Sequence, residues 1–192
     1  MEKQSGIVLK TFFAKKMKIV MLDAQIGKIE AVPTSHELGI GSLLCYYRQQ
    51  RGHLYFLQSV ELFDIPLMLA KEDILFLHHV LEICYFCAPF SGISPEIFSV
   101  VHTLYEERRA PYTAEFKIAF LFKLLILLGM SAQKPQLQDA FYYLLARESI
   151  DTIIDKSIHL DINNALYNWV YDCVQSHPLI HIFKTVHFLN TV

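Results

Sequence analysis

The chain has 192 residues and a mass of 22.2 kDa, which suits one large domain or two small ones. Apolar residues make up 53% of it and charged residues 19%, which is too apolar for a disordered chain and too poor in charge for a coiled coil. Its 17 basic and 19 acidic residues give a net charge of −2, so no strongly basic field covers the whole protein.

The first 65 residues predict β-structure. Alternation of apolar and polar side chains, together with β-branched and aromatic residues, indicates five short strands at residues 6–13, 16–22, 28–32, 43–50 and 53–61. Gly27 suits the tight turn before the third strand, and Pro33 ends that strand. Five strands with tight turns are typical of a small closed barrel of the OB type.

From Pro66 onward the apolar period becomes helical. The predicted helices cover residues 71–88, 95–107, 113–128, 137–148, 150–156, 162–176 and 179–189. The helix at 113–128 is apolar on nearly every side, so we expect it at the centre of a bundle. The sequence therefore predicts an α+β protein, with a five-stranded OB-type barrel at residues 1–65 and an all-α helical domain at residues 66–192.

Neither a secretory signal nor a membrane span is predicted. The N-terminus has no apolar core before a cleavage site. The longest apolar segments, residues 74–90 and 116–130, are shorter than the roughly 20 residues of a span and carry polar or charged side chains. We expect a cytoplasmic protein that binds no membrane, with its four cysteines reduced.

Charge divides between the two predicted domains. Residues 1–65 hold eight basic and six acidic residues, whereas residues 66–192 hold nine basic and thirteen acidic ones. The barrel is therefore the only basic domain, at +2 against −4. Its basic residues are candidates for phosphate contacts, with a solvated barrel face as the alternative: Lys10, Lys15, Lys16, Lys18, Lys28, Arg48 and Arg51. Four aromatic residues are candidates for stacking on unpaired bases or, alternatively, for the barrel core: Phe12, Phe13, Tyr47 and Tyr55.

Several motifs occur in an order that is found in one protein family. Residues 5–11 (SGIVLKT) and 27–32 (GKIEAV) match the way that family begins its first and third strands. Residues 114–129 (AEFKIAFLFKLLILLG) match its central helix, and residues 184–189 its last one. Together they resemble the bacterial RecO (recombination protein O) family of DNA repair proteins.

The resemblance implies a recombination mediator rather than an enzyme, with no cofactor. RecO proteins have an N-terminal OB barrel and a helical domain, bind single- and double-stranded DNA and anneal complementary strands. Their partners are RecR and the C-terminal tail of single-stranded-DNA-binding protein. For such an acidic tail, the candidate partner-binding residues are the central-helix cations Lys117 and Lys123.

The sequence departs from the family in two places. The stretch at 33–37, where relatives carry a basic loop, has no Lys or Arg, and residues 131–161, where many relatives carry a four-cysteine zinc module, have no cysteine. We therefore expect no zinc module and weaker DNA binding than in most relatives. A protein-interaction module that kept the fold but lost most of its DNA binding is the alternative.

A third hypothesis is a metal-dependent enzyme. Cys84 and Cys87 form a C-x-x-C motif, and His78 or His79 would have to supply a further ligand. The two cysteines lie within an apolar helix before Pro89, which favours buried structural thiols. No Ser-His-Asp order, Gly-rich phosphate loop or paired carboxylate motif is present, so we predict no catalytic residues and no metal site.

Overall fold

The computed structural model describes residues 2–13, 17–34, 38–90, 92, 95–106, 112–130, 139–178 and 180–183. The chain divides into two compact units, Met1–Arg108 and Arg109–Val192. Within the described residues, the first unit holds five strands and two α-helices, and the second holds four α-helices and a short 3-10 turn.

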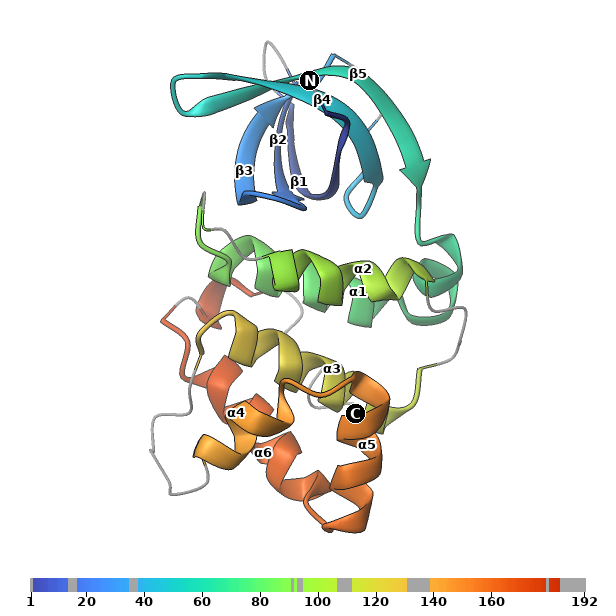
Figure 1. Ribbon diagram of the computed structural model, residues 1–192, viewed down its shortest axis with the longest axis vertical. Coiled ribbons are helices and arrows are strands. Elements are labelled where there is room, and N and C mark those ends of the chain that lie inside the picture. Colours follow the sequence, from blue (N-terminus) through green and yellow to red (C-terminus); the bar gives the residue numbers. More distant parts are fainter. Residues whose placement is uncertain are drawn as a thin grey trace. The chain divides into compact units, whose positions relative to one another are not determined.

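The first unit begins with a closed five-stranded barrel, which confirms the predicted barrel (Figure 1). Its strands are β1 Gln4–Phe13, β2 Met17–Asp23, β3 Gly27–Val32, β4 Leu43–Arg51 and β5 Leu54–Asp64. They are hydrogen-bonded in the order β1–β2–β3–β5–β4, and β4 pairs back onto β1. Every pair is antiparallel except β3 with β5, which is parallel.

Alternate residues of the strands fill the interior of the barrel. Ile19 and Met21 of β2 meet Tyr46 of β4 and Leu57 of β5 there, and all four are 0% exposed. Gly6 lies so close to this core that a Cβ would come within 2.7 Å of the Tyr46 hydroxyl oxygen. Only glycine fits at this position of β1.

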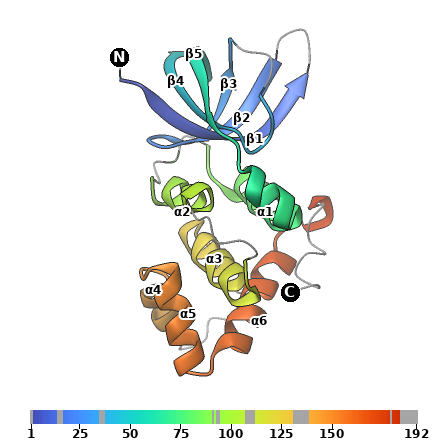
Figure 2. The ribbon, with the colours of Figure 1, turned by 90° about the vertical axis from the view of Figure 1, so that its right-hand side faces the viewer.

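Two helices complete the first unit, α1 Leu67–Cys87 and α2 Pro95–Glu106. Figures 1 and 2 show them side by side against the barrel, where α1 contacts β1 and β2 and α2 contacts β3. The change from strand to helix falls at residues 65–66, where the domain boundary was predicted. The compact unit nevertheless continues through both helices, because they pack on the barrel.

The turn between β2 and β3 lies against the segment that joins α1 and α2. Gly27 has a φ of +75°, and a Cβ there would lie 2.1 Å from the carbonyl oxygen of Gly92. This end of the barrel is therefore covered by the helices. The β4–β5 hairpin reaches out at the opposite end, beyond the arrowhead of β3 (Figure 1).

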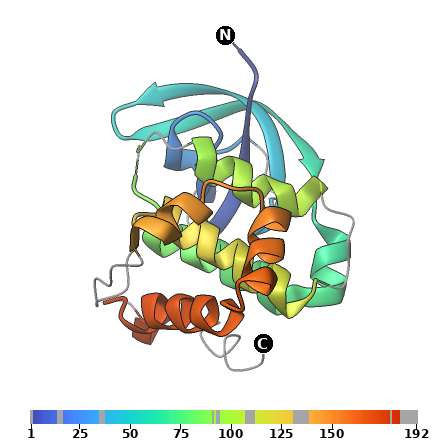
Figure 3. The same ribbon diagram turned by 60° about the horizontal axis from the view of Figure 1, so that its bottom comes forward.

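The second unit is built around α3 Ala114–Leu127. The other elements are α4 Asp139–Leu145, α5 Ile150–His159, α6 Asn163–Gln175 and the 3-10 turn η1 Ile180–Ile182. Figure 2 shows α4 and α5 on one side of α3 and α6 on the other, and Figure 3 shows the yellow α3 beside the red α6. Of the predicted last helix, the structure describes only η1 and its neighbours, and residues 184–192 lie outside the described part.

Apolar side chains on nearly every side of α3 are buried, which confirms its predicted central position. Phe120, Phe122 and Leu124 are 0% exposed, and the Phe122 ring meets the Trp169 ring of α6 edge-on at 5.1 Å between centroids. The Thr113 hydroxyl accepts a hydrogen bond from the Phe116 N–H and so caps the helix. In the described part of the chain, no helix is both long and apolar enough to cross a membrane.

Candidate functional site

The end of the barrel opposite α1 and α2 presents a row of side chains on its outer face. Cross-strand pairing brings one residue of each strand to the same level, and we call these five residues the outer row. The outer row consists of Phe12 in β1, Lys18 in β2, Val32 in β3, Phe56 in β5 and Gln49 in β4. Their chain neighbours Ile19, Ala31 and Leu57 point into the core, so the alternation along each strand directs the outer row away from it.

A planar cation stacks on the outer row at the tip of the β4–β5 hairpin. The Cζ of Arg51 lies 5.2 Å from the ring centroid of Phe56, and its Nη2 donates a 3.1 Å hydrogen bond to the Oε1 of Gln49. Gln49 and Phe56 are cross-strand partners, and Arg51 follows Gln49 by two residues. All three side chains therefore share one face of the hairpin, where Arg51 is exposed but oriented.

Two aromatic rings stand at the end of β1. Phe12 is 38% exposed and Phe13 is 78% exposed, so neither ring is committed to the core. The Nζ of Lys10 lies 5.6 Å from the ring centroid of Phe12 and 4.6 Å from that of Tyr85 in α1. Lys10 thus remains a candidate phosphate contact on the outer face, held beside an exposed ring.

Of the three other candidate lysines near β2, the structure describes only Lys18. Lys18 forms an ion pair with Glu30 of β3, and both side chains are partly exposed. A phosphate at Lys18 would compete with that carboxylate. Lys15 and Lys16, which were also predicted as phosphate contacts, lie outside the described residues.

Lys28 does not lie where a phosphate contact requires it. It is only 4% exposed, its Nζ donates a 2.8 Å hydrogen bond to the Tyr85 carbonyl, and its Nζ lies 4.4 Å from the Phe90 ring centroid. Burial lowers the pKa of Lys28 below its ordinary value of 10.5. This side chain ties β3 to the end of α1, and we remove it from the phosphate contacts.

Arg48 is engaged inside the barrel. Its Nη1 pairs with Asp23, which is fully buried, while the Tyr46 hydroxyl donates a 2.6 Å hydrogen bond to the same carboxylate oxygen. The other oxygen of Asp23 accepts from the backbone N–H groups of Gln25 and Ile26 and so shapes the β2–β3 turn. Burial and the Asp23 charge raise the pKa of Tyr46 well above 10, so it stays a donor. We therefore assign Arg48 to the barrel structure rather than to a phosphate.

The two other predicted stacking residues are less accessible than Phe12 and Phe13. Tyr55 is partly buried and packs against the barrel core. Tyr47 is also partly buried, on the outer face of β4 opposite Gln58. The exposed rings of this barrel end are thus Phe12 and Phe13 of β1, and Phe56, which was not predicted from the sequence, adds a partly buried ring that contacts Arg51.

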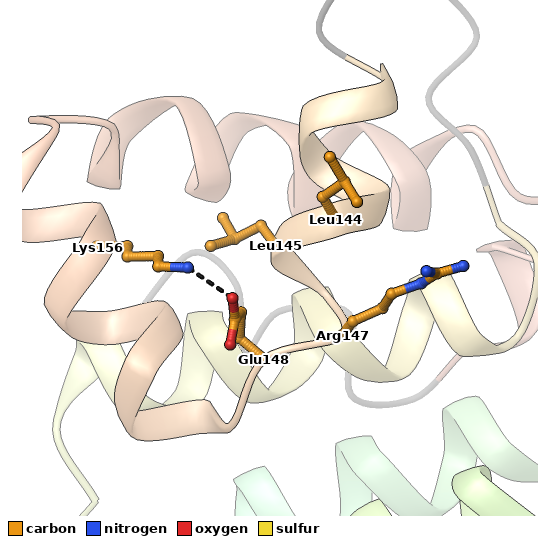
Figure 4. Close-up of a pocket in the computed structure, with 5 residues that line it drawn as sticks. All are labelled: Leu144, Leu145, Arg147, Glu148 and Lys156. Carbon is orange, nitrogen blue, oxygen red and sulfur yellow. Dashed lines mark hydrogen bonds and ion pairs between the residues drawn. The ribbon is translucent and has the colours of Figure 1, made fainter.

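The second unit carries a pocket of about 490 Å³ at the junction of α4 and α5 (Figure 4). It is lined by Leu144, Leu145, Arg147, Glu148 and Lys156. Lys156 pairs with Glu148 at 2.6 Å, and Figure 4 shows Arg147 extending away from that pair. Leu144 is 62% exposed, so the pocket combines an apolar wall with an exposed guanidinium. This arrangement suits a chain end that is both apolar and anionic.

The predicted partner-binding lysines lie elsewhere on α3. The Nζ of Lys123 donates to the carbonyl oxygens of Ala146 and Glu148, which follow the end of α4. Lys123 therefore holds the α4–α5 junction in place, and its ammonium is not offered to a partner as expected. Lys117 is partly buried near the start of α3 and is not among the residues that line the pocket. The pocket cations Arg147 and Lys156 were not identified from the sequence, because only the folded chain brings both of them to the pocket.

Of the thiols and histidines of α1, Cys84 and His79 are buried, Cys87 is partly buried and His78 is exposed. Burial raises the pKa of Cys84 to about 12 and that of Cys87 to about 11, so both are poor nucleophiles and poor metal ligands at neutral pH. Burial lowers the pKa of His79 to about 4. Among the described residues, no group of three His, Cys, Asp or Glu side chains could hold a metal ion.

Two comparisons with known proteins found no relative: a scan against protein-family models gave no match, and neither did a search of curated proteins.

Proposed function

We propose that this chain is a cytoplasmic, non-enzymatic, RecO-like recombination mediator that binds single-stranded DNA through its barrel and partner proteins through its helical unit. The motif order supports the family, and the barrel topology supports the OB type. An OB barrel has five strands, and its ligands lie over β2 and β3 between the β1–β2 and β4–β5 loops. The strand order β1–β2–β3–β5–β4, with β3 parallel to β5, fits that arrangement.

The single observation that carries the DNA-binding proposal is the outer row. It crosses β2 and β3 at the barrel end where those two loops begin, and it combines the exposed Phe12 ring and the partly buried Phe56 ring with nearby cations. Single-strand binders use cations that follow the phosphates and rings on which bases stack. Lys15 and Lys16, in the β1–β2 loop of the sequence, would add charge beside the row.

The proposed DNA affinity is modest. Lys28 and Arg48 are committed to the barrel structure, and Lys18 is already paired with Glu30. Each phosphate that a cation neutralises adds to the affinity by releasing a counterion, so few free cations give weak binding.

An annealing activity follows from the same contacts. Cations beside the backbone reduce the repulsion between two complementary strands, and a shallow row on an outer face leaves the pairing edges of the bases accessible.

Fluorescence anisotropy with a labelled oligonucleotide at low salt tests the DNA proposal. The Lys15→Glu/Lys16→Glu/Lys18→Glu variant should bind at least tenfold more weakly than wild type. A charge-matched control reverses Lys71, Arg147 and Lys156, which belong to other elements, and should bind nearly as wild type does. Equal binding by wild type and the barrel variant would remove the DNA proposal.

The proposed partner site is the α4–α5 pocket, with the acidic tail of single-stranded-DNA-binding protein as one ligand and RecR as a further partner of the protein. A peptide with acidic residues, a terminal aromatic residue and a free carboxylate should bind, and Arg147→Glu should weaken it about tenfold. The amidated peptide should bind more weakly, and Lys71→Glu should have no effect. The partner site would lie elsewhere if the peptide bound wild type, Arg147→Glu and Lys71→Glu equally and the amidated peptide bound wild type just as well.

The second candidate function is a protein-interaction module with little DNA binding. Two observations favour it. Lys28 and Arg48 are engaged in contacts within the first unit and so are not available to phosphates, and residues 33–37 contain no Lys or Arg. If this function is correct, the protein should bind the peptide or RecR, and the anisotropy of a labelled oligonucleotide should not change measurably when the protein is added.

A further inference from the structure

We propose that the tip of the β4–β5 hairpin is a base-stacking platform, in which the Phe56 ring and the Arg51 guanidinium receive one unpaired base. The proposal rests on the proposed function and adds to it the chemical group that the barrel recognises. In this proposal the barrel binds the bases of a single strand as well as its phosphates.

The platform is ordered before any ligand arrives. Gln49 accepts from the Arg51 guanidinium at 3.1 Å, and the guanidinium lies 5.2 Å from the Phe56 ring centroid. Both partners stand on the same face of a two-stranded ladder, so the backbone fixes their spacing. A ligand that uses Arg51 therefore does not have to immobilise a free side chain, which lowers the entropy cost of binding.

Arg51 differs from two other cations of the barrel, Lys18 and Arg48. Lys18 is neutralised by Glu30, and Arg48 is held by buried Asp23. Among the described residues, Arg51 is exposed and makes its hydrogen bond with a neutral amide, so its charge is not cancelled. A planar, uncompensated guanidinium on an aromatic ring can stack on a base and also donate to the neighbouring phosphate.

The outer row extends this platform towards a second ring. Phe56 and Phe12 belong to strands that are three positions apart in the sheet order, or about 14 Å along its surface at a strand spacing of roughly 4.8 Å. Lys18 lies between them. A single strand laid across β2 and β3 could therefore place bases on both rings, whereas a duplex keeps the faces of its bases covered.

A purely structural role is the competing explanation for the Arg51–Phe56 contact. Gly52, with a φ of +64°, forms the tight turn at the hairpin tip, and the contact beside it would then only hold the two strands together. The two explanations differ in one respect: a structural contact has no reason to distinguish an oligonucleotide with bases from one without them.

The first test compares an intact thymidine oligonucleotide with an abasic one of the same length and charge. Wild type should prefer the intact strand. Phe56→Leu and Arg51→Lys, which keeps the charge, should weaken binding to the intact strand about tenfold and to the abasic strand little. Phe56→Tyr, which keeps the ring, should bind as wild type does, and Lys71→Gln on α1 controls for the loss of one cation elsewhere.

The second test places a reporter in the platform. The chain has one tryptophan, Trp169, which is 8% exposed and lies in the second unit. Phe56→Trp adds a ring whose fluorescence should be quenched by the intact oligonucleotide and not by the abasic one, because stacking requires a base.

The outcomes separate this proposal from the proposed function. If wild type binds DNA while Phe56→Leu loses equal affinity for both oligonucleotides, or Phe56→Trp is not quenched, the platform is overturned and DNA binding stands. If wild type binds neither oligonucleotide, the proposed function is overturned and the platform with it.

Discussion

Asp23 joins two parts of the barrel through one buried carboxylate. It accepts hydrogen bonds from the turn that follows β2 and from Tyr46 and Arg48 of β4, so the turn and the opposite strand are fixed by the same side chain. A buried charge of this kind is tolerated because each oxygen has partners, and removing it leaves the mostly buried Arg48 guanidinium without a carboxylate to balance its charge.

Asp23→Ala should therefore lower the free energy of unfolding by about 3 kcal/mol, measured by urea unfolding. Asp23→Asn should cost less, since its carbonyl oxygen can still accept from the turn. The matched control is Glu61→Ala, which removes an exposed carboxylate paired with Lys3 and should change the stability little. Similar losses in both alanine variants would show that the buried network does not stabilise the barrel.

His79 gives the first unit an acid-sensitive residue. It is 1% exposed, and burial lowers its pKa from 6.5 to about 4. The unfolded chain binds this proton below pH 6.5 and the native state does so only near pH 4, so stability should fall between those values, by up to about 3 kcal/mol.

Thermal unfolding of wild type and His79→Gln at intervals from pH 7 to pH 4 tests this titration. The melting temperature of wild type should drop relative to that of the variant as the pH falls from 6.5 to 4. Parallel curves over that interval would mean that His79 titrates alike in both states.

At the scale of elements, α1 is two helical segments joined at Asp73. This residue has a φ of −152° and a ψ of 64°, and its carboxylate accepts a hydrogen bond from the Phe76 N–H at 3.2 Å. The side chain thus caps the second segment, which supplies buried Phe76 and Val80 to the unit. The helix was predicted from the sequence to begin at residue 71, whereas the first of the two segments begins at Leu67.

Asp73→Ala should destabilise the protein by about 1 kcal/mol, because the Phe76 N–H loses its acceptor. Asp73→Ser should recover most of that loss, since serine is a good N-cap. Urea unfolding midpoints of the two variants measure the difference, and an alanine variant as stable as wild type would show that the kink needs no cap.

At the scale of the whole molecule, the charges of the two compact units differ from those of the two predicted domains. The first compact unit has ten basic and twelve acidic residues and the second has seven of each, because α1, α2 and their flanking residues add mostly acidic residues to the barrel's unit. The candidate phosphate contacts of the barrel therefore belong to a compact unit whose net charge is −2. DNA binding should depend on a few local cations rather than on a broad basic face.

The salt dependence of binding measures how many cations contribute. Lys16→Gln should make the plot of log K against log salt shallower by about 0.7, the value for one phosphate contact on a single strand. Lys28→Gln should leave the slope unchanged, because Lys28 is buried against Tyr85. Equal changes in both variants would return Lys28 to the phosphate contacts.

The periodicity of the sequence was sufficient to locate most elements and the central position of α3. The apolar alternation at 16–22 and the apolar stretch at 113–128 show directly which side chains are buried. The period of the buried side chains distinguishes a strand from a helix. The strands at 28–32 and 43–50 agree with the structure to within a residue at each end. The phosphate contacts were harder to predict than the elements. The sequence around a lysine on a strand is the same whether its side chain faces solvent or a helix.

Only the tertiary structure decided which cations are free. In the folded chain Lys28 is buried against α1, Arg48 pairs with Asp23, and Lys18 pairs with Glu30. Gln49, Arg51 and Phe56 lie on one face of the β4–β5 hairpin. These contacts join residues that are distant in the sequence, and their partners follow from barrel closure and strand register. The sequence by itself determined that this protein is a barrel followed by helices with a local excess of lysines, because composition and periodicity record burial. Which charges remain available to a ligand depends on long-range contacts, which composition and periodicity do not record.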